Sequence, residues 1–281
     1  MAYYGKNDSY GSDMYPDKMV SEACTAADTL FDVDFTQYDN NNDGEVDFVF
    51  IIYAGYGEAD GGASTTIWPH AWNLLAAGTQ CKVDGKTVDL YACGNELDFY
   101  SKMHTGIGTF CHEFSHVLGL PDLYATNNAS HATMNEWDIM DYGPYNNEGN
   151  TPPTFSAYER FLMGWLQPRL IVDAENVELK KLQENNEALL ISSTDQHNLI
   201  GNDPNPTTFY LVENRQQKGW DEHLPGHGMM LTKIQYSYSR WYQNTVNNSS
   251  SKMGVDLIEA SGRTSDTGKA TDLFPAGASQ Y

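Results

Sequence analysis

The hydrophobic residues of the first part of the chain change from a helical period to a strand period. After Pro16, seven apolar residues recur at intervals of three and four positions, which predicts an amphipathic helix. Residues 46–53 then form a segment rich in strand-favouring residues that follows a loop rich in Asp, Asn and Gly, and this segment predicts a strand. Asp84-Gly85 lies between two short segments and predicts a hairpin turn.

Two more helices and a series of strands are expected farther along. One helix is predicted at about residues 104–118, where Gly119 and Pro121 follow, and another at about 155–163. Beyond Pro168 the pattern changes to short alternating runs, which predict strands at 177–182, 188–192, 209–213, 229–234 and 255–259. We therefore expect an α+β protein, with a mixed region at 1–168 and a β-rich region at 169–281 that packs on or completes it.

Composition narrows the class of protein. The chain has 281 residues, of which 40% are hydrophobic, and this is enough to form a core. Its 38 acidic and 16 basic residues give a net charge of −22. Such a charge repels phosphate backbones and anionic lipid surfaces, so nucleic-acid binding is excluded. The longest apolar run, residues 48–54, is far shorter than the ~20 residues of a spanning helix, so we expect no membrane insertion.

Four cysteines leave the redox state open. Cys24, Cys81, Cys93 and Cys111 contain no Cys-x-x-Cys unit, so a thiolate zinc site is not expected. A disulfide between Cys81 and Cys93 would close the predicted hairpin, and free thiols fit the sequence equally well. Cys111 lies on the predicted helix and is expected to be a small buried side chain.

The segment His112-Glu-Phe-Ser-His116 carries the strongest chemical signal. Residues four apart lie on one face of a helix, so His112 and His116 can bind one ion. Glu113 lies beside them and can hold a water molecule at that ion. The five-residue pattern alone is weak evidence for a metal site, so the residues that follow it must be considered as well.

Gly119 and Asp122 extend this pattern. On a continuous helix Asp122 would lie roughly 9 Å along the axis from His116, too far to share an ion. Gly119 permits a left-handed turn that brings the chain back toward the ion. Glu213, in the β-rich region, is an alternative third ligand of lower rank.

The spacing His-Glu-x-x-His-x-x-Gly-x-x-Asp resembles the metzincin zinc proteases in the variant whose third ligand is Asp. The run at 112–124 is similar to the immune inhibitor A family of secreted bacterial metzincins, and so are four other stretches: Tyr53-Ala-Gly-Tyr-Gly-Glu58, Trp68-Pro-His-Ala-Trp72, Leu211-Val-Glu-Asn-Arg215 and Leu224-Pro-Gly-His-Gly228. The resemblance extends from about residue 38 to about residue 261.

This resemblance implies a metzincin-like catalytic region with a mixed sheet and an active-site helix. His112, His116 and Asp122 would be zinc ligands, and Glu113 would be the general base. Many metzincins have His where Asp122 stands. An anionic ligand makes the metal-bound water less acidic, so Glu113 would contribute more.

The segment Trp137-Asp-Ile-Met-Asp-Tyr142 is similar to the methionine turn of metzincins, with Met140 as its methionine. In astacins and serralysins a Tyr at this spacing reaches the metal or the transition state. Tyr142 is therefore a candidate catalytic residue, although the immune inhibitor A family does not always have a Tyr here.

A second metal site is predicted before the first strand. The loop resembles the start of an EF-hand calcium loop, with oxygen ligands at Asp39, Asn41, Asp43, Glu45 (through its carbonyl) and Asp47. Gly44 permits the sharp turn, whereas Phe50 replaces the bidentate Glu of a complete EF-hand. We expect structural calcium here, and the alternative is an Asn/Asp/Gly turn that needs no metal.

Other candidate residues have simpler interpretations. His223 and His227 are separated by Pro225 and Gly226, so they are expected in a loop. His70 is expected in a packed aromatic cluster between Trp68 and Trp72. Alternating aromatic residues form either an exposed ledge or strand packing, and these are Tyr236, Tyr238, Trp241 and Tyr242.

The sequence thus predicts a zinc endopeptidase that acts on proteins or peptides and is secreted or bound to the cell envelope. In the expected mechanism Glu113 takes a proton from a metal-activated water, and Tyr142 donates to the developing oxyanion. The resemblance implies removal of a leader and a pro-peptide. A zinc hydrolase of non-peptide bonds is one alternative, and a catalytically silent binding module is the other; the intact Glu113 disfavours the second.

Overall fold

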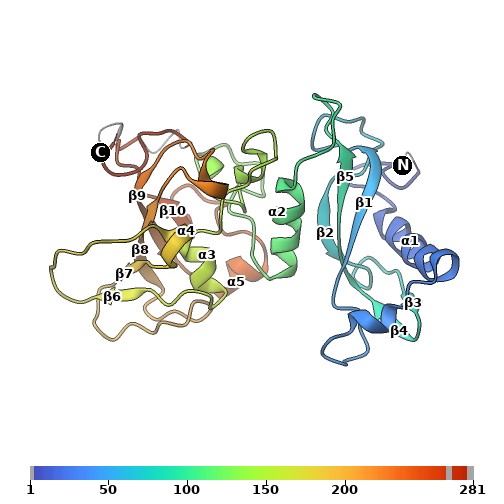
Figure 1. Cartoon of the computed structure of the whole chain (residues 1–281), viewed down its shortest axis with the longest axis horizontal. Coiled ribbons are helices and arrows are strands. Elements are labelled where there is room, and N and C mark those ends of the chain that lie inside the picture. Colours follow the sequence, from blue (N-terminus) through green and yellow to red (C-terminus); the bar gives the residue numbers. More distant parts are fainter. Residues whose placement is uncertain (1–2, 264–267, 277–281) are drawn as a thin grey trace. The chain divides into compact units, whose positions relative to one another are not determined.

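The computed structural model describes residues 3–263 and 268–276, and the chain forms two compact units, Met1–Val117 and Leu118–Tyr281 (Figure 1). This division differs from the boundary predicted after residue 168, which stays a prediction. Among the described residues, no helix combines the length and the apolar composition that a membrane crossing requires. Both helices and sheets are present, in agreement with an α+β protein.

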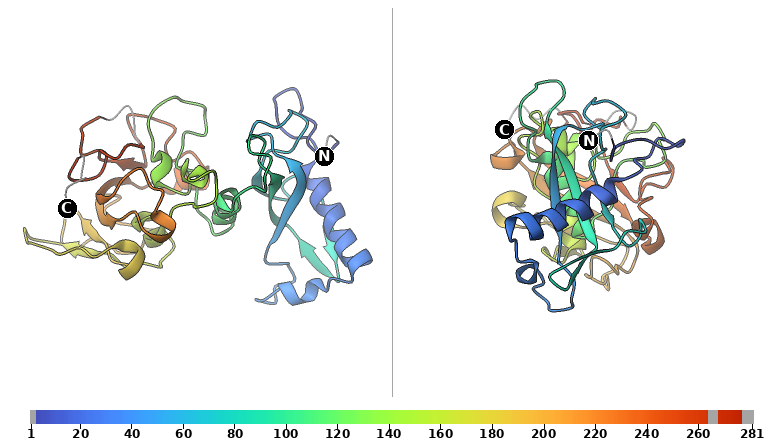
Figure 2. Two further views of the ribbon diagram at one scale, coloured as in Figure 1. Left: turned by 45° about the horizontal axis from the view of Figure 1, so that its top comes forward. Right: turned by 90° about the vertical axis from the view of Figure 1, so that its right-hand side faces the viewer.

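The first unit contains a three-stranded sheet between two helices. Its strands are β1 (Val49–Tyr56), β5 (Leu90–Leu97) and β2 (His70–Asn73), in the order β1-β5-β2. β1 runs parallel to β5, and β2 runs antiparallel to it. Helix α1 (Pro16–Phe31), which confirms the predicted first helix, lies across this sheet (Figure 2), and α2 (Gly108–Val117) lies on its other face.

Strand alternation in β1 explains these three layers. Val49, Ile51 and Tyr53 belong to the core that also contains Met19 and Val20 of α1. Side chains of opposite parity point to the other face of a sheet. There the Phe48 ring lies 5.4 Å from Phe114 of α2, and the Phe50 ring lies 4.5 Å from Phe110.

The predicted hairpin is confirmed as β3 (Cys81–Val83) and β4 (Lys86–Val88). Its turn residues Asp84 and Gly85 have φ of 49° and 79°, which is the left-handed conformation that a two-residue turn requires. The Asp84 side chain also accepts a hydrogen bond from the backbone N–H of Phe35 at 2.9 Å. This bond anchors the short 3₁₀ helix η1 (Phe35–Tyr38) to the hairpin.

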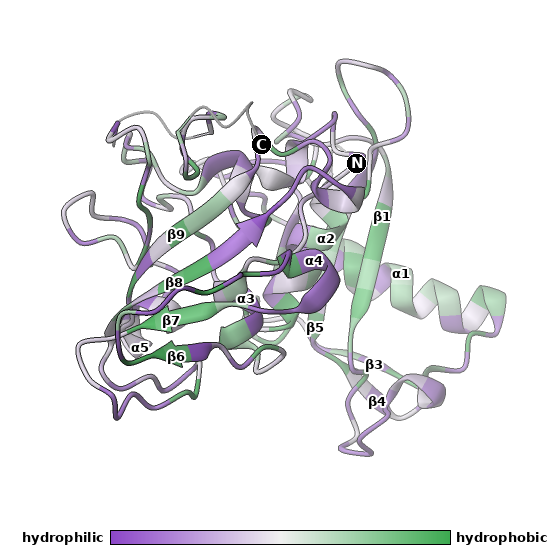
Figure 3. Cartoon of the chain, turned by 60° about the vertical axis from the view of Figure 1, so that its left-hand side comes forward, coloured by the Kyte–Doolittle hydropathy of each residue, from purple (hydrophilic) through white to green (hydrophobic). Residues whose placement is uncertain are grey.

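The second unit is built on a five-stranded sheet whose order is β10-β9-β8-β7-β6. The predicted strands at 188–192, 209–213, 229–234 and 255–259 are confirmed. All neighbours are antiparallel except β6 and β7. The bounds are β6 Arg169–Ile171, β7 Leu189–Ile191, β8 Thr208–Arg215, β9 Gly228–Gln235 and β10 Val255–Leu257. Figure 3 shows that β8 changes from hydrophobic to hydrophilic toward its C-terminal end.

Short helices flank this second sheet. Helix α3 (Ala157–Leu162) begins with a capping box, in which the Ser156 side chain accepts from the N–H of Glu159 and the Glu159 side chain accepts from the N–H of Ser156. The other helical elements are α4 (Leu182–Asn185), α5 (Tyr238–Tyr242), η2 (Asn135–Trp137), η3 (Gly143–Tyr145) and η4 (Gly219–Asp221).

Three predictions of local structure need correction. The strand predicted at 177–182 is wrong, because Leu182 instead begins α4 and buries its side chain in the core beside Ala157. Residues 238–242 form α5, so strand packing is wrong there, and the exposed Tyr238 and Tyr242 fit the alternative of an exposed ledge. Helix α2 begins at Gly108 rather than near His104, which forms an isolated bridge with Leu97.

Candidate metal centre

Helix α2 presents two different faces. Phe110 and Phe114 stack at 6.0 Å and pack on β1. Residues two apart on a helix are rotated by about 200°, so His112 and His116 lie on the side that faces away from these phenylalanines. The helical period thus explains the predicted pair. Phe110 and Phe114 are four residues apart and pack on the sheet. His112 and His116 are also four apart and lie on the opposite side, where they can bind an ion.

The structure brings together His112, Glu113 and His116. One potential ligand atom from each side chain lies within 4.8 Å of the other two. The two imidazole rings are 4.8 Å apart between centroids and nearly perpendicular, at 83°. Glu113 is buried, with 6% of its surface exposed. Two imidazole nitrogens and a carboxylate oxygen are donors that zinc binds at about 2.0–2.2 Å, so these residues fit this ion.

The chain turns where the sequence predicts a turn. Helix α2 ends at Val117, and Gly119 has a φ of 98°. No heavy atom lies within 4 Å of a Cβ built on Gly119, so its backbone conformation, rather than space, requires glycine. Asp122 lies in the second unit and is 4% exposed. Its role as third zinc ligand stays a prediction.

Asn244 forms hydrogen bonds with both the backbone and the carboxylate of Asp122. The backbone N–H of Asp122 donates to Asn244 Oδ1 at 2.7 Å, and Asn244 Nδ2 donates to Asp122 Oδ2 at 2.6 Å. This residue was not predicted from the sequence, because asparagine has no periodic signal and lies 122 positions away.

Met140 is fully buried in a tight turn next to the Asp122 loop. Its carbonyl accepts from the N–H of Leu123 at 2.7 Å, and its N–H donates to Asp138 Oδ1 at 2.8 Å. The N–H of Gly143 donates to the Asp138 carbonyl at 2.9 Å. A Cβ on Gly143 would lie 2.3 Å from that carbonyl oxygen, so only glycine fits here. The turn therefore supports the backbone that follows Asp122.

Tyr142 follows this turn and is 56% exposed. Its ring lies 6.0 Å from that of Tyr145. An exposed phenol can donate a hydrogen bond to a substrate, but its contact with metal or transition state stays a prediction.

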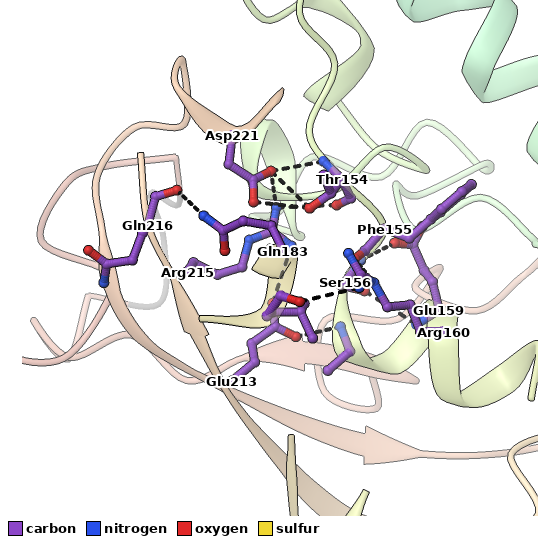
Figure 4. Close-up of polar contacts among 12 residues, drawn as sticks. Thr154, Phe155, Ser156, Glu159, Arg160, Gln183, Glu213, Arg215, Gln216 and Asp221 are labelled. Atoms are coloured by element: carbon purple, nitrogen blue, oxygen red, sulfur yellow. Dashed lines mark hydrogen bonds and ion pairs between the residues drawn. The ribbon is translucent and has the colours of Figure 1, made fainter. Parts of the chain in front are cut away.

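Glu213, the alternative third ligand, is bound by protein groups. Its carboxylate lies 3.2 Å from Arg215 Nη1 and accepts from the N–H of Ala157 (Figure 4). Arg215 Nη2 also contacts Asp221 Oδ1 at 2.9 Å, and Asp221 in turn accepts from Thr154. Burial raises the pKa of Glu213, whereas Arg215 opposes this shift. The carboxylate thus has a structural role in this buried network.

The predicted calcium loop is closed by its own hydrogen bonds. Asp39 accepts from the N–H groups of Asp43 and Gly44, each at 3.0 Å, and pairs with Lys86 Nζ at 2.6 Å. Asn41 donates to Asp43 at 2.8 Å, and Asp47 accepts from Asn40. The hydrogen bond from Lys86 lowers the pKa of Asp39. Calcium binding by Asp39, Asn41, Asp43, Glu45 and Asp47 stays a prediction, and in this structure Lys86 supplies a positive charge.

His70 is a packed histidine, as predicted. Its Nδ1 lies 2.7 Å from the Trp68 carbonyl oxygen, and its Nε2 lies 2.9 Å from the Tyr91 hydroxyl. Burial lowers the pKa of His70. The partner ring is Tyr91, at 5.4 Å. The predicted neighbours Trp68 and Trp72 are each 55% exposed, so they do not form the packed cluster around His70.

The structure also locates the remaining histidines and cysteines that the sequence singled out. His223 is an exposed turn residue, and His227 lies in the loop before β9, as predicted. Cys111 is only half-buried, rather than buried. Cys93 lies in β5, and its Sγ is 3.5 Å from His70 Nδ1.

Comparisons with known proteins agree with this geometry. Residues 1–170 match the family described as immune inhibitor A peptidase M6, catalytic domain. Immune inhibitor A of Bacillus thuringiensis subsp. alesti is 32% identical over 187 residues, which cover 57% of this chain and 27% of that protein. The pre-pro-metalloprotease PrtV of Vibrio cholerae serotype O1 (strain M66-2) is 29% identical over 208 residues, or 65% of this chain and 22% of that protein. This chain thus spans about a quarter of the length of these relatives.

Proposed function

The chain belongs to the immune inhibitor A peptidase M6 family, and from this premise we propose that it is a zinc-dependent endopeptidase. The observation that carries the proposal is the convergence of His112, Glu113 and His116 on one helix. The two imidazoles suit a single zinc ion, the Glu113 carboxylate lies beside them, and the family is one of metal-dependent peptidases.

Bound zinc would lower the pKa of a water molecule and polarise a substrate carbonyl. His112 and His116 would hold the ion, and Glu113 would accept the proton of the attacking water and deliver it to the leaving amine. The buried position of Glu113 beside both histidines supports this role, because its carboxylate can reach a water molecule held between them. Tyr142 would donate a hydrogen bond to the oxygen on which negative charge develops.

Asp122 is proposed as the third ligand, which would make the site a metzincin-type site. The spacing from His116 and the left-handed backbone of Gly119 support this assignment. Met140 would then be the methionine of the turn that supports the site. Calcium in the 39–47 loop is a further proposal, and there the ion would compete with Lys86, which is paired with Asp39.

The substrates proposed are proteins or peptides, and the site of action is outside the cytoplasm, in the medium or at the cell envelope. The relative whose name describes a pre-pro-metalloprotease supports processing of a leader and a pro-peptide. A zinc hydrolase of non-peptide bonds would need the same three side chains, so activity assays must include both kinds of substrate.

Three variants test the proposal in an assay on denatured casein, with zinc content measured for each protein. Glu113→Gln is expected to keep about one zinc per chain and to lose at least about 100-fold in kcat/KM. Tyr142→Phe should lower kcat by about 100-fold, with zinc retained. Glu222→Gln, at an exposed turn position, is the matched control and should behave as the wild type.

Other outcomes separate the alternatives. Zinc binding without casein cleavage, together with hydrolysis of an ester or N-acyl sugar substrate, would support the non-peptide hydrolase. Zinc binding with neither activity would support a silent binding module. A protein that binds no zinc after supplementation would contradict the ligand assignment.

A further inference from the structure

Residues 244–248 hold the segment that carries Asp122. Asn244 forms a closed pair of hydrogen bonds with Asp122, at 2.7 Å to its backbone and 2.6 Å to its carboxylate. Thr126 Oγ1 donates to the Asn244 carbonyl at 2.8 Å. One side chain therefore fixes both the main chain and the side-chain rotation of a single residue.

Asn244 is itself held by its backbone, whose N–H donates to the Trp241 carbonyl at 3.2 Å. Its φ of 53° is a left-handed conformation that asparagine tolerates better than most residues. Nearby, the fully buried Asn247 donates to the carbonyls of Leu123 and Val255, each at 2.8 Å, and accepts from the N–H groups of Gly254 and Val255. These bonds connect the Asp122 segment to strand β10, so that the sheet of the second unit supports it.

The chemistry of the contact suits a metal ligand. Asn244 is neutral, so it orients the Asp122 carboxylate without cancelling its negative charge. Hydrogen bonds that orient a ligand typically change metal affinity by 10- to 100-fold when they are removed.

We propose that Asn244 is a positioning residue that holds Asp122 ready to bind zinc. This inference rests on the proposed role of Asp122 as the third ligand. It gives the β-rich region a defined part in the metal site, through the segment 244–248.

The test measures the zinc dissociation constant by competition with a chromophoric chelator, independently of catalysis. Asn244→Gly keeps the left-handed backbone and removes the side chain, and we expect it to weaken zinc binding by about 10- to 100-fold. Asn244→Asp places a second anion beside Asp122 and should weaken binding at neutral pH as well. Asn128→Gly is the matched control, because Asn128 has a φ of 60° and is exposed. It should stay within about threefold of the wild type.

The outcomes distinguish this inference from the function on which it rests. If Asp122→Asn binds zinc as tightly as the wild type, the assignment of Asp122 as a ligand is wrong. If Asp122→Asn weakens binding but folded Asn244→Gly and Asn244→Asp do not, only the positioning role is overturned. Circular dichroism of each variant establishes that it is folded.

A different observation concerns two cysteines of the first unit. Cys24 of α1 and Cys81 of β3 are 2% and 3% exposed and belong to one core. Cys81 Sγ lies 3.9 Å from the Ser21 carbonyl, one helical turn before Cys24 on the same face. The two thiols interact: Cys81 raises the pKa of the Cys24 thiol, and Cys24 lowers that of the Cys81 thiol. Cys93 instead lies against His70.

We propose that Cys24 and Cys81 form a disulfide when the protein folds in the presence of a low-molecular-weight disulfide. The Cys81 thiolate attacks one sulfur of that disulfide and releases its first thiolate. Cys24 then loses its proton to solvent, attacks Cys81 Sγ and releases the second thiolate. Two protein thiols are thus oxidised, and one small disulfide is reduced to two thiols. The hydrogen bond from Cys24 lowers the pKa of Cys81 to about 6, which favours Cys81 as the attacking group.

Thiol titration in denaturant, after refolding with oxidised and reduced glutathione, tests this pairing. We expect two free thiols, a Cys24–Cys81 cross-linked peptide in non-reducing digests, and a melting temperature that falls by about 5 °C or more on reduction. Cys93→Ser should keep the cross-link, and Cys24→Ser should abolish it. Four free thiols, or a Cys81–Cys93 peptide, would overturn the proposal.

Discussion

Arg215 Nη2 lies 2.9 Å from Asp221 Oδ1, and neither side chain is exposed to solvent. The same guanidinium contacts Glu213 at 3.2 Å. Replacing Arg215 with Met would leave two buried carboxylates without their cation. We therefore expect the free energy of unfolding to fall by about 3–5 kcal/mol, which urea denaturation can measure.

The matched control is Arg169→Met, because Arg169 and its partner Glu175 are 52% and 42% exposed. Solvent screens such a pair, so its loss should cost less than about 1 kcal/mol. Equal effects of the two substitutions would show that the Arg215 network is not the stabilising feature that its burial implies.

Gly119→Ala tests the turn between His116 and Asp122. A left-handed φ costs an alanine about 1 kcal/mol, and the strain falls on the segment that carries the proposed ligand. We expect a similar loss of stability in Gly78→Ala, whose φ is 83°. Only Gly119→Ala should also weaken zinc binding, as measured by chelator competition. Unchanged zinc affinity in a folded Gly119→Ala protein would argue against a requirement for this turn.

Asp141 should contribute a pH dependence to stability. Burial raises its pKa from 3.8 to about 6, so the folded state holds a proton that the unfolded state releases. Its stabilising contribution is complete below about pH 4 and is lost as the pH rises through 6, by up to about 3 kcal/mol. Asp141→Asn keeps an acceptor for the N–H of Asn135, at 2.9 Å in the wild type, and cannot ionise.

The measurement is the difference in unfolding free energy between Asp141→Asn and the wild type at pH 4, 6 and 8. This difference should move in favour of the variant as the pH rises. A difference that is constant over this range would contradict the raised pKa.

The 39–47 loop offers a test of calcium binding. If the loop binds calcium, millimolar calcium chloride should raise the melting temperature of the wild type, and Asp39→Asn should abolish the rise. Lys86→Met removes the competing ammonium from Asp39, so it should increase calcium affinity. If calcium changes neither the wild type nor Lys86→Met, the loop is a turn that needs no metal.

Features that depend on local sequence could be predicted. The helical period gave α1 and the His112–His116 pair, and Asp84-Gly85 marked the hairpin. Strand β2 was not predicted, because it is only four residues long and follows a proline. Helix α5 was not predicted either, because its five residues lie in a run of alternating aromatic residues. Asn244 could not be predicted, because its contact with Asp122 depends on how distant segments pack.

The strand expected at 177–182 shows how packing overrides a local pattern. Alternating apolar residues suit an edge strand, but the Leu182 side chain is buried in a small core beside Ala157 and Ala188. That burial sets the direction of the chain at Leu182. Only an isolated bridge, from Lys181 to Asn214, remains of the expected strand.

The Asp84 side chain matters to anyone who wishes to insert a tag or a reporter into this protein. Hairpin tips are usual sites for such insertions, yet here the carboxylate at the tip also bonds to Phe35, far away in the sequence. An insertion between Asp84 and Gly85 would therefore disturb two segments at once. The turn at residues 76–78, all three of which are exposed, is the better place for one.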